Sequence, residues 1–163
     1  MLQIDFLTEL FRKARAQGIH TTLDTSANPF DPDSPEFMNK FEKLMEVTDL
    51  VMLDIKEMDP EKHKALTGQT NENILALADW LSDHGKAMWI RHVLVPDLTD
   101  DEEGLRALRA KLDQWTSVER VEILPYHTLG LFKWENLGIV YPLEGVRTPT
   151  LEEVEKAEKI LGI

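Results

Sequence analysis

Apolar residues along the chain alternate between helical spacing and short continuous runs. Phe6, Leu7, Leu10 and Phe11 recur at helical spacing and Gly18 follows as a stop, which predicts an opening helix. The run LVMLDI is apolar almost throughout, which is typical of a strand buried on both faces. Four such runs, rich in aliphatic and β-branched residues, predict strands at residues 19–24, 50–55, 88–95 and 121–126.

Helices are predicted between and after these strands. Asp59 and Pro60 offer a cap and a first helical position, and Thr150 with Glu153 forms a capping-box signature for a closing helix. Further helices are expected near residues 36–47, 71–84 and 100–115, and residues 127–147 are expected to form a long loop. This alternation predicts a parallel α/β sheet. Its four strands are too few to close a barrel, for which about eight are usual.

Composition narrows the class of protein. The 163 residues are 42% hydrophobic and 29% charged, which suits one folded domain. A net charge of −12 disfavours nucleic-acid and anionic-membrane partners. No apolar run approaches the roughly 20 residues that cross a bilayer, and the first residues lack the pattern of a secretory signal. We therefore expect a cytoplasmic protein.

The absence of cysteine excludes disulfides and thiolate-bound metal or iron–sulfur sites on this chain.

Polar residues cluster where the predicted strands end. In parallel α/β folds this edge holds the binding site. The candidates are Asp24, Thr25, Asp54, Lys56, Arg91, His92 and His127. Together the carboxylates could hold a cation, and Lys56 could hold an anionic ligand group. A helix-capping or loop-stabilising role is the alternative for any one of them.

The remaining histidines and the tryptophans have simpler expected roles. We expect His63 and His84 to be solvent-exposed on helices, and His20 and His92 to be satisfied groups in the core or at its rim. The tryptophans are expected in the core. The exception is Trp134, which lies in the glycine- and aromatic-containing stretch LGLFKWENLG, a composition typical of a binding loop.

Four segments together carry a resemblance to a known family. They are HTTLDTSAN, EVTDLVMLDIKEMDPEKHKALTG, WIRHVLVPDLTDD and VEILPYHTLGLFKWENLG. In order and separation they resemble the pyruvate formate-lyase activating enzymes of the radical S-adenosylmethionine superfamily, most specifically in DLVMLDIK and LPYHTLGLFKWE. The resemblance extends over essentially the whole chain.

This resemblance implies a partial open parallel (βα) barrel. The family barrel has six strands, of which residues 1–163 would supply the last four as a single partial domain, beginning in the helix after the second. The family's cluster loop CxxxCxxC and its GGE motif do not occur in this sequence. The chain is therefore expected to be a C-terminal fragment that is inactive alone. Removal of two strands would leave an open sheet edge, so the fragment is expected to self-associate.

The resemblance also assigns site residues by position. Asp54, Ile55, Lys56 and His127 would line the S-adenosylmethionine pocket, with Arg91 as a further candidate. A monovalent-cation site would comprise Asp24, Thr25, Met52 and Asp54. The loop from His127 to Trp134 would meet the glycine-bearing segment of the partner protein. The stretch DTSANPF departs from the family's more usual DTNG.

The implied function is that of an activating enzyme. Such an enzyme uses S-adenosylmethionine and a [4Fe-4S] cluster to generate a glycyl radical on pyruvate formate-lyase. Two alternatives remain open. The chain could be an aldolase-type enzyme in which Lys56 forms a Schiff base, or it could be a non-catalytic binding module.

Overall fold

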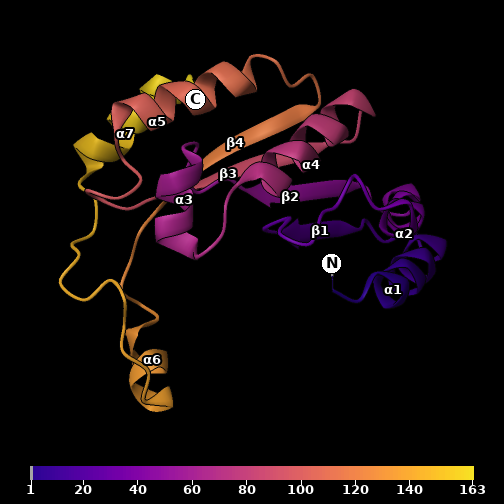
Figure 1. The fold of residues 1–163 in the computed structure, drawn as a ribbon, viewed down its shortest axis with the longest axis horizontal. Helices are drawn as coiled ribbons and strands as arrows, with labels where there is room; N and C mark the ends of the chain where they lie inside the picture. Colours follow the sequence, from indigo (N-terminus) through magenta and orange to yellow (C-terminus); the bar gives the residue numbers. More distant parts are fainter. Residues whose placement is uncertain (1) are drawn as a thin grey trace.

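Four parallel strands form one sheet in the order β1-β2-β3-β4 in the computed structural model, which describes residues 2–163 (Figure 1). The strands are β1 (Thr22–Thr25), β2 (Leu50–Asp54), β3 (Met88–Leu94) and β4 (Val118–Pro125). The helices are α1 (Ile4–Ala16), α2 (Pro35–Glu46), α3 (Pro60–Thr67), α4 (Glu72–Asp83), α5 (Glu102–Leu112), α6 (Leu131–Leu137) and α7 (Leu151–Leu161). The predicted open parallel α/β sheet is confirmed.

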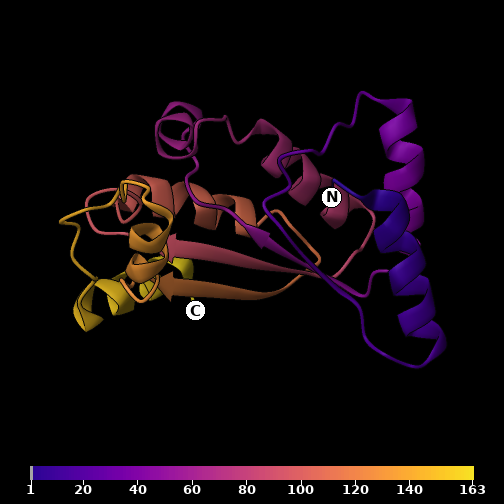
Figure 2. The ribbon, with the colours of Figure 1, turned by 90° about the horizontal axis from the view of Figure 1, so that it is seen from below.

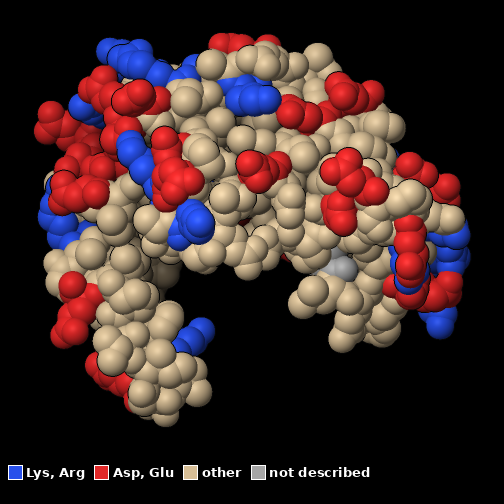
Figure 3. Space-filling view, in the orientation of Figure 1, with Lys and Arg blue, Asp and Glu red and all other residues tan. Residues whose placement is uncertain are grey.

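Helices cover one face of the sheet and leave the other face open. In Figures 1 and 2, α3, α4 and α5 lie along one side of the sheet, and α1 and α2 pack together beyond β1. The carboxyl ends of the strands point toward the end of the molecule where α3 and α6 lie (Figure 2). The space-filling view shows the molecule hollowed on the open side, between α6 and the α1–α2 end (Figure 3).

The core lies between the sheet and the covering helices. Leu53 and Ile90 from the sheet and Leu77 and Leu108 from the helices are fully or almost fully buried. Phe41 on α2 is also fully buried, and its ring lies edge-on to the rings of Phe30 and Trp80. β2 is flanked by β1 and β3, and its Val51 and Leu53 are buried in the core. The predicted burial on both faces is wrong for Met52 and Asp54, which are half-buried because helices cover only one face of the sheet.

Two predicted strand starts and one predicted loop are wrong. The first strand begins at Thr22 because the preceding Thr21 bonds to other partners, its amide donating to the Asp49 carboxylate at 2.8 Å and its hydroxyl to the Val47 carbonyl at 2.7 Å. The fourth strand begins at Val118, opposite Met88 of β3. The expected long loop contains α6, a helix of 7 residues that ends at Gly138 with φ of +64°.

The predicted helix caps are confirmed. The Asp59 carboxylate accepts from the amides of Glu61 and Lys62, and Pro60 opens α3. At α7 the Thr150 hydroxyl accepts from the Glu153 amide, and the Glu153 carboxylate accepts from the Thr150 amide at 2.8 Å. These bonds satisfy helix amides that have no partner within the helix.

The start of α7 should make stability depend on pH. Ion pairing with Arg147 and the bond from the Thr150 amide lower the pKa of Glu153 to about 2. The folded-state pKa of Glu153 lies below the ordinary value of about 4.3. The ionised Glu153 carboxylate therefore stabilises the folded state above pH 4.3, and this stabilisation is lost as pH falls toward 2. Substitution Glu153→Gln should therefore flatten the acid side of the stability curve in urea unfolding. An unchanged profile between pH 5 and 2 would contradict this, and Glu155→Gln is the matched control.

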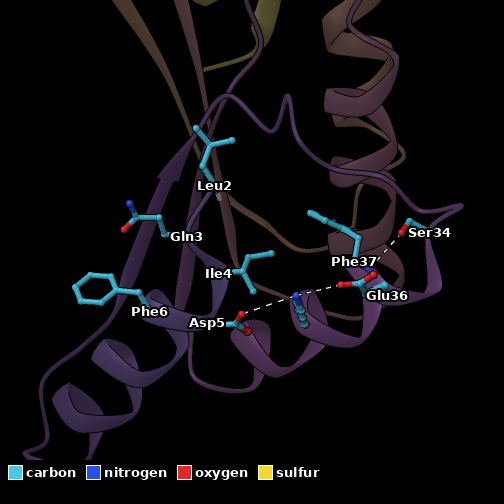
Figure 4. Close-up of a pocket in the computed structure, with 9 residues that line it drawn as sticks. Leu2, Gln3, Ile4, Asp5, Phe6, Ser34, Glu36 and Phe37 are labelled. Carbon is cyan, nitrogen blue, oxygen red and sulfur yellow. Dashed lines mark hydrogen bonds and ion pairs between the residues drawn. The ribbon is translucent and has the colours of Figure 1, made fainter.

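The α1 end exposes apolar surface next to the open edge of the sheet. On α1, Phe6 is 62% exposed and Leu10 is 47% exposed. A groove of about 480 Å³ separates the starts of α1 and α2, and the Phe6 ring points away from Phe37 on α2 (Figure 4). On the same side β1 is an edge strand.

We expect this end to drive self-association at high concentration, because unpaired strand edges and apolar patches both favour it. Sedimentation velocity should show concentration-dependent dimers or larger species that decrease in Phe6→Asp. Leu98→Asp, at an exposed leucine outside this end, is the control. A monomer at every concentration would contradict the expectation.

Candidate binding site at the carboxyl ends of the strands

A charged network joins the carboxyl-terminal residues of β1 and β2 to the middle of β3. Arg91 Nε donates to Asp54 Oδ1 at 2.9 Å, and Arg91 Nη2 lies 2.7 Å from the same oxygen and also donates to Asp24. Lys56 Nζ donates to Asp54 Oδ2 at 2.9 Å. Arg91 therefore links two carboxylates, and Asp54 is shared by two cations.

Strand register brings these side chains together. Asp54 is opposite Arg91 in the β2–β3 ladder, and Asp24 is opposite Met52 in the β1–β2 ladder. Arg91 is mostly buried, whereas the Asp24 side chain is 55% exposed. Burial opposes the charge of Arg91, but hydrogen bonds and attraction from Asp24 and Asp54 outweigh it and raise the pKa of Arg91. The guanidinium therefore stays charged, as arginine does generally.

The network has two positive and two negative groups within ion-pair distance. It can therefore accept a zwitterionic ligand, with the ligand's anionic group on Lys56 or Arg91 and its cationic group on a carboxylate. Since each charge already has a partner, a ligand must exchange one ion pair for another. The network by itself therefore selects ligands by the arrangement of their charges, but it adds little to binding affinity.

Other candidate residues lie around this network in different settings. Ile55 is buried, and its backbone carbonyl is 2.9 Å from a ring nitrogen of His92. The Thr25 hydroxyl accepts from the Ala27 amide at 3.0 Å, which stabilises the turn after β1. Met52 is half-buried on β2. His127 follows β4 and is exposed.

A small cavity opens beside the network. Its volume is about 200 Å³, and it is lined by Asp54, Lys56, Ser26, Asn28, His63, Thr67, Gln69 and Ile74. His63 was expected on the surface but is only 3% exposed. That prediction is wrong because the chain turns back after Gly68 and places the Gln69 carbonyl 2.6 Å from His63 Nδ1. Its other ring nitrogen has no partner among the described residues.

The remaining histidines and tryptophans match the predictions in part. His92 is buried, with its ring nitrogens 2.9 Å from the Ile55 carbonyl and 2.8 Å from the Thr99 carbonyl. His84 is exposed, as predicted, and Trp115 is buried. His20 is exposed, contrary to the prediction of a strand residue in the core or at its rim, because β1 begins only at Thr22. Two other tryptophans, Trp80 and Trp89, are half-buried.

The segment that contains α6, residues 128–146, forms an arm that projects from the end of β4 (Figure 1). On this arm the Trp134 ring lies edge-on to Tyr141, with centroids 5.4 Å apart. The Tyr141 hydroxyl is 2.7 Å from that of Tyr126 at the end of β4. Burial, followed by this hydrogen bond, raises the pKa of Tyr141 to about 12. The arm is therefore fastened at its base, while Phe132 and Leu137 stay exposed.

Comparisons with known proteins identify the class. The family model described as the Radical SAM superfamily matches residues 1–108, and the chain belongs to this superfamily. It is 56% identical over 160 residues to the pyruvate formate-lyase-activating enzyme of Streptococcus mutans, covering 98% of this chain and 60% of the relative. It is 48% identical over 161 residues to that of Listeria monocytogenes, covering 99% and 64% respectively. The resemblance to these activating enzymes is confirmed, and the chain spans 60 to 64% of their length.

Solved structures agree on the fold. A domain of the pyruvate-formate lyase-activating enzyme from Bacteroides vulgatus superposes with a TM-score of 0.79 at 22% identity, covering 99% of this chain and 86% of that one. Streptococcus suis SuiB superposes with a TM-score of 0.68 at 14% identity, covering 95% of this chain and 32% of that one. Such low identities support the fold alone.

The superfamily implies two groups, an iron–sulfur cluster and S-adenosylmethionine. Without cysteine, this chain does not fit a thiolate-bound cluster. S-adenosylmethionine, which carries a carboxylate, an ammonium and a sulfonium, does fit the mixed charges of Asp24, Asp54, Lys56 and Arg91. Within residues 2–163, no group of three or more His, Cys, Asp or Glu side chains is arranged to hold a metal ion. Over the same residues, no helix is long and apolar enough to span a membrane.

Proposed function

We propose that this chain supplies the S-adenosylmethionine-binding and partner-facing part of a cytoplasmic pyruvate formate-lyase-activating enzyme. The charged network of Asp24, Asp54, Lys56 and Arg91 carries the proposal. It lies in a chain that is 56% identical to an enzyme of that name. The [4Fe-4S] cluster would have to be held by residues other than these 163, because none of them is a cysteine.

Each residue of the network has a role that follows from its charge. Lys56 and Arg91 would bind the ligand carboxylate, while Asp54 would orient the Lys56 ammonium and hold cationic or hydroxyl groups. Ile55, which is buried in the core, would hold the chain between Asp54 and Lys56 in place, and His127 would lie where the pocket meets the partner. When bound, S-adenosylmethionine supplies the radical chemistry of the superfamily, and the protein supplies orientation and exclusion of water.

The arm and the cation site complete the proposal. The exposed Phe132 and Leu137 support docking of the glycine-bearing segment of pyruvate formate-lyase on the arm. A monovalent cation at Asp24, Thr25, Met52 and Asp54 remains a prediction. Its binding would compete with the Arg91 guanidinium, which contacts both carboxylates.

An NMR titration with S-adenosylmethionine tests the proposal. Backbone shifts should cluster on residues 54–56 and 127. The dissociation constant should be in the millimolar range, because several charge-assisted contacts worth about 1.5–3 kcal/mol each are lacking without the cluster. Lys56→Ala should weaken binding about tenfold through loss of one such contact. Lys43→Ala, at an exposed lysine on α2, should leave it unchanged. Shifts that are scattered, or that persist unaltered in Lys56→Ala, would overturn the proposal.

The aldolase alternative has less support. A Schiff base requires a neutral amine, whereas Lys56 forms an ion pair with Asp54 at 2.9 Å. Borohydride treatment with small aldehydes should therefore give no adduct at Lys56 above that at the exposed Lys43. Selective trapping at Lys56 would favour the aldolase instead.

A further inference from the structure

His92 on β3 is a buried histidine whose two ring nitrogens both lie against carbonyl oxygens. The residue is 4% exposed. Its Nδ1 is 2.9 Å from the carbonyl oxygen of Ile55, and its Nε2 is 2.8 Å from that of Thr99. A carbonyl oxygen can only accept, so both hydrogen bonds exist together only when each ring nitrogen carries a proton. The geometry therefore fits a doubly protonated ring that joins the loop after β2 to the loop after β3.

The alternation of β3 places His92 and its neighbour Arg91 on opposite faces of the sheet. Arg91 Nε donates to the Asp54 carboxylate at 2.9 Å. From the buried face, His92 reaches the backbone carbonyl of the next residue, Ile55. These two contacts hold the two residues that directly precede Lys56 in the chain.

The backbone on the other side of Lys56 is also held by a buried side chain. Asn71, which is 2% exposed, donates through Nδ2 to the Glu57 carbonyl at 2.9 Å and to the Met58 carbonyl at 2.8 Å. The buried Glu57 accepts through its carboxylate from the amides of Met58 and Asp59, at 2.7 and 3.0 Å. Lys56 therefore extends from a loop whose backbone is fixed both before and after it.

The chemistry of His92 indicates a requirement on backbone position. Burying polar groups is unfavourable unless each one has a hydrogen-bond partner. Phenylalanine would fill a similar volume in the core without any polar atom to satisfy. A ring that donates to the Ile55 and Thr99 carbonyls therefore adds something that packing alone does not need, which is a fixed position for these two carbonyl groups.

We propose that His92 is a positioning residue for Lys56, and that its doubly protonated ring fixes the Ile55 carbonyl and thereby the direction in which the Lys56 ammonium meets Asp54 and a ligand. The proposal rests on the proposed function and deepens it, because Lys56 would bind the carboxylate of S-adenosylmethionine. His92 is not among the residues that line the cavity beside the network, so its effect on a ligand passes through Lys56.

Nitrogen NMR of the unmodified chain counts the protons on the ring. With ¹⁵N-labelled histidine, both His92 nitrogens should show a directly bonded proton at the pH of the S-adenosylmethionine titration. Both protons should exchange slowly with solvent, because the ring is buried. The exposed His84, whose Nδ1 is 2.8 Å from the Trp80 carbonyl, is the internal reference for a ring with one carbonyl partner. A single bonded proton on His92 would overturn the proposal.

Lysine labelling measures the positioning without any ligand. Acetic anhydride should modify Lys56 more slowly than the exposed Lys43, because Lys56 is paired with Asp54. In His92→Phe, which donates no hydrogen bond, Lys56 should react severalfold faster. In Leu108→Ala, truncated at a buried leucine of α5, Lys56 should react at its original rate although the free energy of unfolding falls. An unchanged rate in His92→Phe, or an equal rise in Leu108→Ala, would overturn the proposal.

Binding of S-adenosylmethionine supplies a third measurement. His92→Phe should weaken binding by up to about tenfold, the factor expected for Lys56→Ala. The double variant should bind no more weakly than Lys56→Ala alone, because His92 acts through Lys56. Losses that multiply in the double variant would overturn the proposal. His92→Gln, which keeps a donor for one carbonyl, should recover part of the loss.

The outcomes separate this proposal from the proposed function. If S-adenosylmethionine perturbs residues 54–56 but His92→Phe binds it as tightly as the unmodified chain, the role of His92 fails and the proposed function stands. If residues 54–56 are unperturbed, the proposed function fails, and lysine labelling still tests whether His92 positions Lys56. Thermal unfolding verifies that each variant folds. If His92→Phe does not fold, His92→Gln is labelled in its place, with a smaller rise in the Lys56 rate expected and an unchanged rate counting against the proposal.

Discussion

Anaerobic reconstitution of this chain with iron, sulfide, a reductant and S-adenosylmethionine is expected to yield no 5′-deoxyadenosine. The reason is chemical, since the electron-donating cluster of the superfamily is held by thiolates and the sequence contains no cysteine. No 5′-deoxyadenosine at all should form, because Lys56, Asp54 and Arg91 can orient a ligand but cannot donate an electron. Product would be measured by chromatography and cluster formation by visible absorbance.

The Streptococcus mutans relative, treated identically, is the positive control. A fusion that places the N-terminal part of that relative before this chain should restore product formation, and Lys56→Ala should lower it within the fusion. Cluster absorbance with turnover in the unfused chain would show that ligands other than cysteine hold a working cluster, and would contradict the expectation.

Phe41→Ala is expected to cause a large loss of stability. The Phe41 side chain is fully buried between Phe30, Phe37 and Trp80, with ring centroids 5.1, 5.9 and 4.9 Å away. Truncation removes the transfer free energy of the ring and leaves a cavity, so the free energy of unfolding should fall by about 3–5 kcal/mol. Urea unfolding followed by tryptophan fluorescence measures this loss.

Phe132→Ala is the matched control for that experiment. Phe132 is exposed on the arm, so the same chemical change should alter the free energy of unfolding by no more than about 0.5 kcal/mol. Equal losses at the two positions would mean that the aromatic cluster around Phe41 does not contribute to the core as described. A loss at Phe132 alone would place the arm in the cooperative unit.

Local sequence signals predicted much of the fold. The run LVMLDI identified β2, and the caps at Asp59 and Thr150 fixed two helix starts, because these features depend on neighbouring residues alone. The helix α6 was missed because its 7 residues span barely two turns and carry no clear apolar period. Gly138, which adopts a left-handed conformation at its end, was the available signal.

The sequence predicted which residues belong to the candidate site, but not which of them form ion pairs with one another. Parallel strands place Asp24, Asp54 and Arg91 at one edge, which sequence order alone implies. That Arg91 links both carboxylates depends on strand register, which the sequence pattern does not specify. Burial of His63 depends on the turn at Gly68, so a helical position among charged neighbours gave the wrong expectation.

The hydroxyl pair of Tyr126 and Tyr141 has a consequence for recognition. It joins two points 15 residues apart in the chain and so closes the arm into a loop with restricted freedom. Because the pKa of Tyr141 is about 12, this closure persists throughout the physiological pH range. A partner that docks on Phe132 and Leu137 thus meets a surface that is already ordered, and less conformational entropy is lost on association than with an untethered loop.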